Sequence, residues 1–391
     1  RIDNPQYIVE GSNIKQNQLN NTAYFYGPTT IYNKQNRANK VYTEEGHFNQ
    51  NTDEVYLNKN SKIFYNDKIL TGDKMYFNRT TGFGKANGNV MLDDPYEKRF
   101  IKGGYGEIYE KKDSAMITEK PYAVKAMSQD SIYFAAEKII TFQKPDSLDP
   151  TKKKSFLRAF KKGRLYKSNA QARADSISFN ETDGVLHLNG KPILWSGEKQ
   201  VTGDKIEVYF NTETEHIDSL KVIGNAFAIS ESDSLNMKDE FDQVKGKLMS
   251  VYYVDNEIKL AKVIENAQAI TYADDLDEKT KLKERIGINL STCGVIEAEF
   301  EIRKIQVISC NIGATADTYP MSMIPKEKRF FPDFNWNTKD RLKKWQDIFV
   351  ESPNYPETIY ESDTTLYDKA QEAVQKEKDK QEAKKPKRVK K

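Results

Sequence analysis

The sequence is poor in apolar residues, histidine and cysteine. Of its 391 residues, 37 % are hydrophobic and 30 % charged, and there are only three histidines and two cysteines. A large compact enzyme core is disfavoured, because ordinary domains are roughly 45–50 % apolar. Cys293 and Cys310 are too few for a disulfide scaffold or a zinc site. The histidines lack metal-ligand spacing, so neither a metal nor a cofactor is predicted.

Long hydrophobic runs are missing as well. No segment approaches the roughly 18–20 apolar residues that a membrane-spanning helix needs. The chain opens on the polar run Arg1-Ile2-Asp3, so a secretory signal was either removed or never present. A net charge of +3 is too small to indicate nucleic-acid binding. What the chain does have is 22 Tyr and 19 Phe, which favour β-strands and argue against disorder.

A repeated pattern of alternating apolar residues organises the sequence. In its clearest copy, Gly72-Asp73 begins the strand-like run that ends at Phe77, and Gly88 begins a second run that ends at Leu92. The period of two predicts strands, and Asn- and Gly-rich stretches between the runs predict turns. One such strand pair cannot bury its apolar face alone, whereas stacked pairs can. The sequence therefore predicts an elongated all-β array of strand pairs, each about 30 residues long.

Repeat starts are predicted near residues 11, 44, 72, 103, 129, 174, 203 and 246, so the array covers residues 1–310. The long step after 129 is interpreted as a basic insertion at about 143–168. Residues 311–367 are predicted to form an aromatic extension with a short helix between Lys339 and Phe349. The charged residues 368–391 are predicted to be a solvated helix or a disordered tail.

The inward positions of the repeat are the first candidate site. They could line a groove for an apolar ligand, or they could be an ordinary packed core, which is the more frequent role for any single residue. The candidates are Met75, Phe77, Val90, Leu92, Ile132, Phe134, Ile177, Phe179, Leu188, Leu194, Ile206, Val208 and Val222.

The repeated aspartates are interpreted as structural. Asp73, Asp130, Asp175 and Asp204 recur once per unit at one strand position, which is typical of turn capping. No two are paired for general acid–base chemistry. The sequence also lacks a Ser/His/Asp motif and a Gly-rich phosphate loop, so no enzymatic activity is predicted.

A basic stretch and the two cysteines complete the candidates. The basic side chains could contact lipid phosphates or an anionic membrane surface, or they could belong to a solvated loop. If the strands around residues 301–302 form a hairpin, Cys293 and Cys310 lie opposite each other and could form a disulfide; two separate thiols are the alternative. The basic candidates are Lys152, Lys153, Lys154, Arg158, Lys161, Lys162 and Arg164.

The ordered series of repeats resembles the OstA-like family, the β-jellyroll proteins of lipopolysaccharide transport. The resemblance is carried by Gly72–Phe77, Gly88–Leu92 and Gly203–Phe210 and covers roughly residues 7–310. The run Tyr24–Ile31 looks like a form common in Bacteroidota members.

This resemblance implies an open, V-shaped β-jellyroll in the periplasm, with or without association with the outer membrane. It also implies binding of lipopolysaccharide acyl chains in an apolar groove and edge-to-edge stacking with other jellyroll-containing transport proteins. Neither a nucleic acid nor a transmembrane helix is implied. A structural β-repeat scaffold or adhesin-like binding module without a lipid groove is the main alternative. A β-helix enzyme acting on polysaccharides would require clustered carboxylates.

Overall fold

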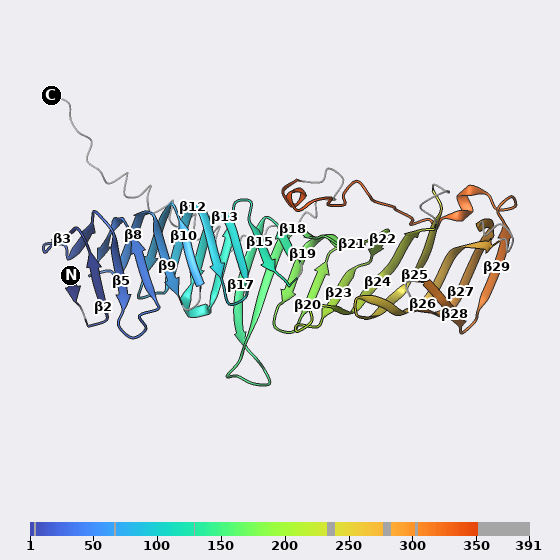
Figure 1. Ribbon diagram of the computed structural model, residues 1–391, viewed down its shortest axis with the longest axis horizontal. Coiled ribbons are helices and arrows are strands. Elements are labelled where there is room, and N and C mark those ends of the chain that lie inside the picture. Colours follow the sequence, from blue (N-terminus) through green and yellow to red (C-terminus); the bar gives the residue numbers. More distant parts are fainter. Residues whose placement is uncertain are drawn as a thin grey trace, which may run out of the picture. The chain divides into compact units, whose positions relative to one another are not determined.

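The computed structural model describes residues 1–350 except 4, 66–67, 129, 233–238, 277–282 and 302–303. Arg1–Glu351 form one compact unit. The prediction of an all-β chain built from stacked antiparallel strands is confirmed. The first strands lie at one end of the unit and β29 lies at the other, with the middle of the chain between them (Figure 1). The tail at 368–391 lies outside the described residues.

The strands form two layers that share one hydrogen-bonded network. Every described pairing is antiparallel, and each layer is a ladder of short strands alternating with halves of longer ones. The short strands of layer 1 are β1 (Ile2–Asp3), β2 (Tyr7–Gly11), β5 (Thr29–Asn33), β6 (Lys40–Thr43), β9 (Ser61–Tyr65), β10 (Lys68–Gly72), β15 (Tyr122–Ala126), β16 (Ser131–Ala135), β21 (Ile193–Ser196), β22 (Lys199–Thr202) and β29 (Thr315–Pro320).

Layer 2 lies against the inner face of layer 1. Its short strands are β3 (Ile14–Asn17), β4 (Thr22–Phe25), β7 (Glu45–Asn49), β8 (Glu54–Lys59), β11 (Lys74–Asn78), β14 (Ser114–Thr118), β17 (Lys138–Pro145), β20 (Val185–Asn189), β23 (Lys205–Phe210) and β28 (Lys304–Asn311).

Long bent strands run through both layers and join them along one side. One half of each pairs in layer 1 and the other half in layer 2. They are β12 (Phe83–Asp94), β13 (Arg99–Tyr109), β18 (Lys153–Lys167), β19 (Ala170–Asn180), β24 (Ile217–Glu231), β25 (Phe241–Val254), β26 (Glu257–Leu276) and β27 (Lys283–Glu301). We call the joined side the corner and the opposite side, where the hairpin turns of both layers end, the mouth.

The corner is built from a repeated backbone motif. Two consecutive residues with positive φ turn the chain, as in Gly88-Asn89 and Gly190-Lys191. At eight of these corners a backbone N–H donates to a carbonyl of the neighbouring strand over 2.8–3.3 Å. The donor and acceptor pairs are Ser12 and Pro28, Glu44 and Lys59, Asp73 and Gly88, Gly104 and Glu119, Glu137 and Lys161, Asp175 and Gly190, Asp204 and Gly224, and Gly294 and Ile312.

The corner explains the repeated aspartates. The Asp73 carboxylate accepts hydrogen bonds from the Asn89 amide at 2.9 and 3.2 Å, and Asp204 accepts two from Asn225 at 3.1 Å. These contacts tie the strand that enters the corner to the bend of its neighbour. Their role here is structural.

The fifth repeat differs from the predicted one. Asp130 lies at the mouth, where its carboxylate accepts hydrogen bonds from the backbone and hydroxyl of Ser168. The corner residue is Glu137, whose carboxylate pairs with Lys162 at 3.4 Å. With the repeat placed there, residues 143–168 are not an insertion, because they form the end of β17, a turn and the regular strand β18.

The predicted helix between Lys339 and Phe349 is also corrected. The helices of the described residues are short 3₁₀ turns, namely η1 (Glu110–Lys112), η2 (Lys326–Arg329) and η3 (Trp345–Phe349). The apolar side chains that suggested a longer helix are instead anchored individually on the outer face of layer 1.

Candidate functional site

A continuous apolar interior lies between the two layers. It extends from Tyr7 and Val9 near the N-terminus to Ile296 in β27. Rings from the two layers meet across it, with centroids 5.0 Å apart for Tyr7 and Phe48 and 6.2 Å apart for Phe134 and Phe179. Every groove candidate predicted from the sequence faces this interior. All are buried except Phe77, which is half-buried and packs against the same cluster.

Between the layers a cavity opens at the mouth toward the N-terminal end. It has a volume of about 120 Å³ and is bounded by Ile31 and Ile63 of layer 1 and by Val55 and Phe77 of layer 2. A second, smaller cavity of about 40 Å³ follows, bounded by Leu70 and Leu92 among others. Both are smaller than the clefts of about 300–1,000 Å³ that bind small molecules, so side chains fill most of the interior in this structure.

Charged side chains stand at the mouth of the first cavity. The Arg79 guanidinium lies over the Tyr7 ring at 4.6 Å and 3.7 Å from the Asp53 carboxylate. Burial raises the pKa of the Glu110 carboxyl, and the nearby charges of Arg79 and Lys111 oppose that rise. The cavity is therefore apolar inside and charged at its rim.

Further along, a network of charged groups connects the two layers across the mouth. We call Asp94, Glu97, Arg99, Lys125, Ser155 and Glu181 the edge cluster. The Arg99 guanidinium of layer 1 contacts Glu181 in the β19–β20 turn of layer 2, and it pairs with Asp94 at 3.0 Å. The Arg99 and Glu181 side chains are only 2 % and 1 % exposed.

Additional hydrogen bonds extend the edge cluster. The Lys125 ammonium lies 3.0 Å from Glu181, and the Ser155 hydroxyl donates to Glu97 at 2.8 Å. Nearby, the backbone and hydroxyl of Ser128 both donate to Glu215 at 2.7 Å. Burial opposes ionisation of Glu215, but these bonds hold the pKa of its carboxyl below the ordinary value. The layers are therefore joined at the mouth as well as at the corner.

The edge cluster was missed from the sequence, although a signal for it exists. Arg99 and Lys125 lie two residues from the inward-facing Ile101 and Ala123, on the same face of their strands. Glu181 likewise follows the inward-facing Phe179 by two residues. Charged residues at inward positions of a strand need partners, because an unpaired buried charge is costly.

The basic candidates are not brought together. Lys153 contacts Asp113, and Lys154 pairs with Asp183 at 2.7 Å beside the mouth. Lys152 pairs with Asp149 at 3.6 Å, and Arg158 lies over the Phe142 ring at 5.0 Å. Lys161 and Lys162 form a corner bend, while Arg164 donates to the Val350 carbonyl on the outer face of layer 1. This dispersal does not produce a basic patch.

Residues 321–350, which we call the strap, run back across the outer face of layer 1 (Figure 1). Phe331 packs on Phe227, and Trp345 stacks on Tyr133 with centroids 5.3 Å apart. The sequence contains a signal for the strap: some residues that face outward from layer 1, such as Trp195, are apolar. These side chains are buried beneath the strap.

Buried polar side chains hold the strap in place. Gln200 donates to the Asn335 carbonyl at 2.6 Å, and Arg173 donates to the Asp340 carbonyl at 2.6 Å. Trp195 donates through its indole nitrogen to the Asn337 carbonyl at 2.9 Å. These bonds pair backbone groups that would otherwise be buried without partners.

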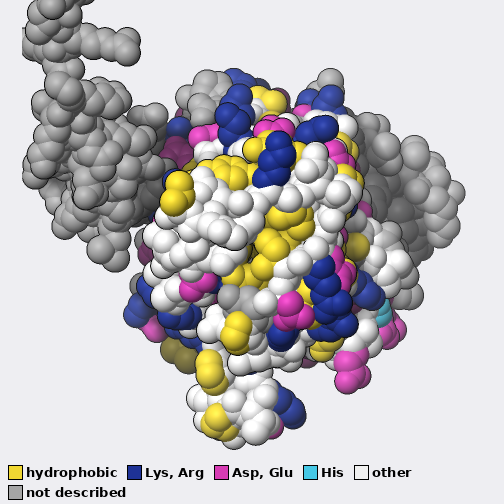
Figure 2. Space-filling model, turned by 90° about the vertical axis from the view of Figure 1, so that its left-hand side faces the viewer, with side chains coloured by type: hydrophobic (Ala, Val, Ile, Leu, Met, Phe, Trp, Pro, Cys, Tyr) yellow, Lys and Arg dark blue, Asp and Glu magenta, His cyan; other side chains and the backbone are white. Residues whose placement is uncertain are grey.

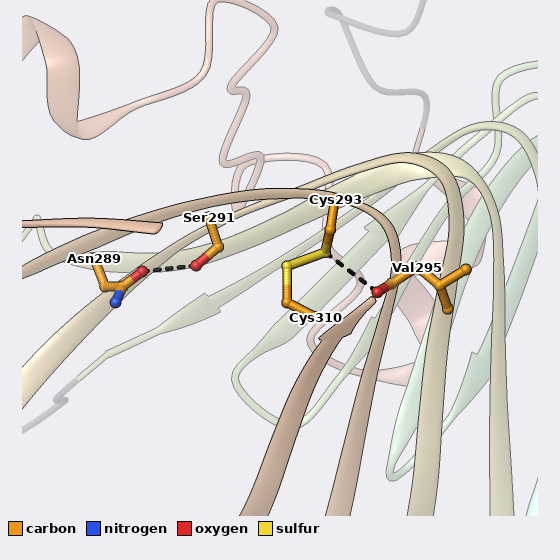
Figure 3. Close-up of a disulfide and its surroundings, with 5 residues drawn as sticks. All are labelled: Asn289, Ser291, Cys293, Val295 and Cys310. Carbon is orange, nitrogen blue, oxygen red and sulfur yellow. Dashed lines mark hydrogen bonds between the residues drawn. A yellow bond between two sulfur atoms is a disulfide. The ribbon is translucent and has the colours of Figure 1, made fainter. Parts of the chain in front are cut away.

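Cys293 and Cys310 are joined by a disulfide at the last corner (Figure 3). The strand register differs from the predicted one, because Cys310 lies opposite Ile296 and not opposite Cys293. The bridge therefore reaches past the bend at Gly294, with Cα atoms 5.8 Å apart. Cys293 is buried and also lies 3.2 Å from the Val295 carbonyl.

Removal of this disulfide is expected to weaken the last repeat. The bridge closes a loop with a sequence separation of 17, and a 15-residue loop is worth about 3 kcal/mol. Cys293→Ser/Cys310→Ser should therefore lower the free energy of unfolding by about 2–4 kcal/mol. Chemical denaturation measures this change. Alkylation of the native chain without reductant should leave its intact mass unchanged, and two alkyl additions would contradict the bridge.

Other chemistry is not assembled in the part of the chain that the structure describes. Those residues contain no group of three or more His, Cys, Asp and Glu side chains that could hold a metal ion. They also contain no helix that is long and apolar enough to cross a membrane. The interior, its mouth and the edge cluster are thus the features on which a function can be built.

Two stacked β-layers around a continuous apolar interior define the class of β-jellyroll arrays. Residues 110–214 match the family model described as "LptA/(LptD N-terminal domain) LPS transport protein". This segment is therefore similar to a lipopolysaccharide-transport family, in agreement with the OstA-like resemblance of the sequence repeats.

A solved structure gives a further comparison. The chain is similar to LptH, described as the LptA homologous periplasmic component of the conserved lipopolysaccharide transport device from Pseudomonas aeruginosa. The sequences are 14 % identical, the TM-score is 0.28, and the similarity covers 39 % of this chain and 95 % of that chain. No curated protein sequence matches the chain.

Proposed function

We propose that this chain holds the acyl chains of lipopolysaccharide in the interior between its layers and carries the lipid across the periplasm to the outer membrane. The observation that carries the proposal is the continuity of the apolar interior over the length of the array. The similarity of residues 110–214 to the lipopolysaccharide-transport family model supports the same role.

The end of the array that carries β1 to β3 supports a conduit. On this face hydrophobic side chains form a band across the middle, with charged side chains around it (Figure 2). An acyl chain placed along such a surface leaves water, which is worth about 0.8 kcal/mol for each CH₂ group. For a chain of about 12 carbons this amounts to about 10 kcal/mol, enough to hold the lipid without any covalent chemistry.

Association with other jellyroll-containing transport proteins is part of the proposal. Among the described strands β1 pairs only with β2, so its outer edge can continue the ladder into a second protein through backbone hydrogen bonds. We expect the chain to have no chemistry of its own and to depend on an ATP-driven partner to move the lipid.

Site-specific photo-crosslinking tests the proposal. A photoreactive amino acid at Phe77 or Ile206 should form adducts with purified lipopolysaccharide, because both side chains face the interior. The same amino acid at Tyr76 or Glu207, which alternate with these residues and point outward, provides the matched control. The absence of adducts at every inward position would overturn the proposal. Adducts of equal yield at inward and outward positions would overturn it as well.

A further inference from the structure

The edge cluster closes the mouth at a place where the proposed function requires an opening. Glu97 and Arg99 lie at and beside the β12–β13 turn of layer 1, and Ser155 and Glu181 lie at the ends of layer 2. The groups touch directly, with both side chains of the central pair almost completely buried. The Ser128–Glu215 contact closes the next stretch of the mouth in the same way.

A lipopolysaccharide has two parts with opposite solvent requirements. Its acyl chains gain free energy in the interior, whereas its saccharide carries many polar groups whose burial without partners is costly. The saccharide must therefore stay in water and protrude through the mouth while the acyl chains occupy the interior. Because direct contacts fill the mouth at the edge cluster, the saccharide cannot pass this point unless the two edges separate.

We propose that the edge cluster and the adjoining Ser128–Glu215 contact together form a gate that must open for lipid to pass along the array. This inference rests on the proposed function and adds a control point to it. When the gate is closed, the Arg99–Glu181 and Lys125–Glu181 pairs join the layers. When it is open, these charges face water and the saccharide fits between the edges.

The chemistry of the edge cluster suits a reversible closure. Buried ion pairs contribute little net stability, because the cost of removing both charges from water offsets their attraction. When the edges separate, the ions regain that hydration. Separation of two apolar edges would instead be unfavourable, because it would expose apolar surface to water. The Arg99 Nε atom is buried without a hydrogen-bond partner among the described residues, so the closed state leaves one donor unsatisfied.

A covalent lock tests the gate in the full chain. Ser128→Cys/Glu215→Cys places one thiol on each edge, and a short bismaleimide reagent added without reductant should join them and leave the native disulfide intact. The matched control is Asp130→Cys/Ser168→Cys, which joins two neighbouring turns of layer 1 and leaves the mouth free to open. Each pair also carries a photoreactive amino acid at Phe179, beneath the edge cluster, or at Phe77, beside the N-terminal cavity.

The expected result is specific to the position of the photoreactive group. Locking Ser128→Cys/Glu215→Cys should lower lipopolysaccharide adducts at Phe179 by about tenfold and leave those at Phe77 unchanged. The control pair should change neither. Equal labelling at Phe179 with and without the lock would overturn the gate, because lipid would then reach this point past closed edges. If no interior position is labelled in the unlocked chain, the proposed function itself fails, which is a different outcome.

Discussion

Replacement of Gly190 by alanine is expected to be among the most destabilising single changes in this chain. A Cβ atom at Gly190 would lie 2.1 Å from the Asp175 carboxylate and 2.7 Å from the Asp175 Cβ. Rotation of the Asp175 side chain cannot remove the second clash, because Cβ is fixed to the backbone. The φ angle of +75° adds strain for any residue with a side chain. We expect a loss of about 2–5 kcal/mol, from the sum of backbone strain and overpacking.

Gly197 provides the control for the backbone part of this effect. Its φ angle is +56°, yet no atom lies within 4 Å of the position that a Cβ would occupy. Gly197→Ala should therefore lower the free energy of unfolding only by the cost of placing alanine in the left-handed conformation, about 1–2 kcal/mol. Chemical denaturation of both variants separates strain from clash, and Gly190→Ala/Asp175→Gly should recover most of the difference. Equal losses at the two glycines would show that the corner tolerates a side chain.

The second large effect is expected in the strap. Ile348 is fully buried against Leu342 and Ala135, so Ile348→Ala should cost about 2–5 kcal/mol of local stability. A loss of about 3 kcal/mol raises the population of the detached strap end about a hundredfold. Because Lys343 and Lys344 are exposed and lie in this segment, cleavage there by trypsin should accelerate in proportion.

An exposed aliphatic residue two positions further on supplies the comparison. Val350 is 60 % exposed, and its hydrogen bonds are made by its backbone: its N–H donates to the Asp347 carbonyl, and its carbonyl accepts from Arg164. Val350→Ala should therefore leave the cleavage rate almost unchanged. If both variants are cleaved at the wild-type rate, burial of the Ile348 side chain does not hold the strap on layer 1, and the prediction is wrong.

Much of the fold could be predicted because the repeat has a strong local signal. Gly88, Gly190 and Gly224 occupy bends that require positive φ, and each has an aspartate beside it. The fifth corner uses Lys161-Lys162 for the same bend, so no glycine occupies its two positive-φ positions. The pattern at Asp130 then resembled a repeat start although it lies at the mouth. Local sequence thus identifies the unit, while the pairing of distant strands fixes its phase.

The site was predicted less completely for a related reason. Alternation identifies inward residues such as Phe134 and Ile206, because it depends only on the strand period. The contact between Arg99 and Glu181 joins residues separated by 82 positions. Its existence depends on how the two layers are offset along the array, which no local pattern encodes. The position of the strap could not be predicted either, because the sequence does not show which outward faces of the strands are covered.

The offset between the two layers determines where the chain can be shortened. At the corner, Asp73 meets Gly88 within one repeat, whereas at the mouth Arg99 meets a turn several strands further along the chain. If the chain is cut between two repeats that lie between Arg99 and Glu181, the two partners of this contact end up in different fragments. A shortened chain ending near residue 130 would keep its corners but expose the Arg99 charge. The repeats are modular along the corner and interdependent along the mouth.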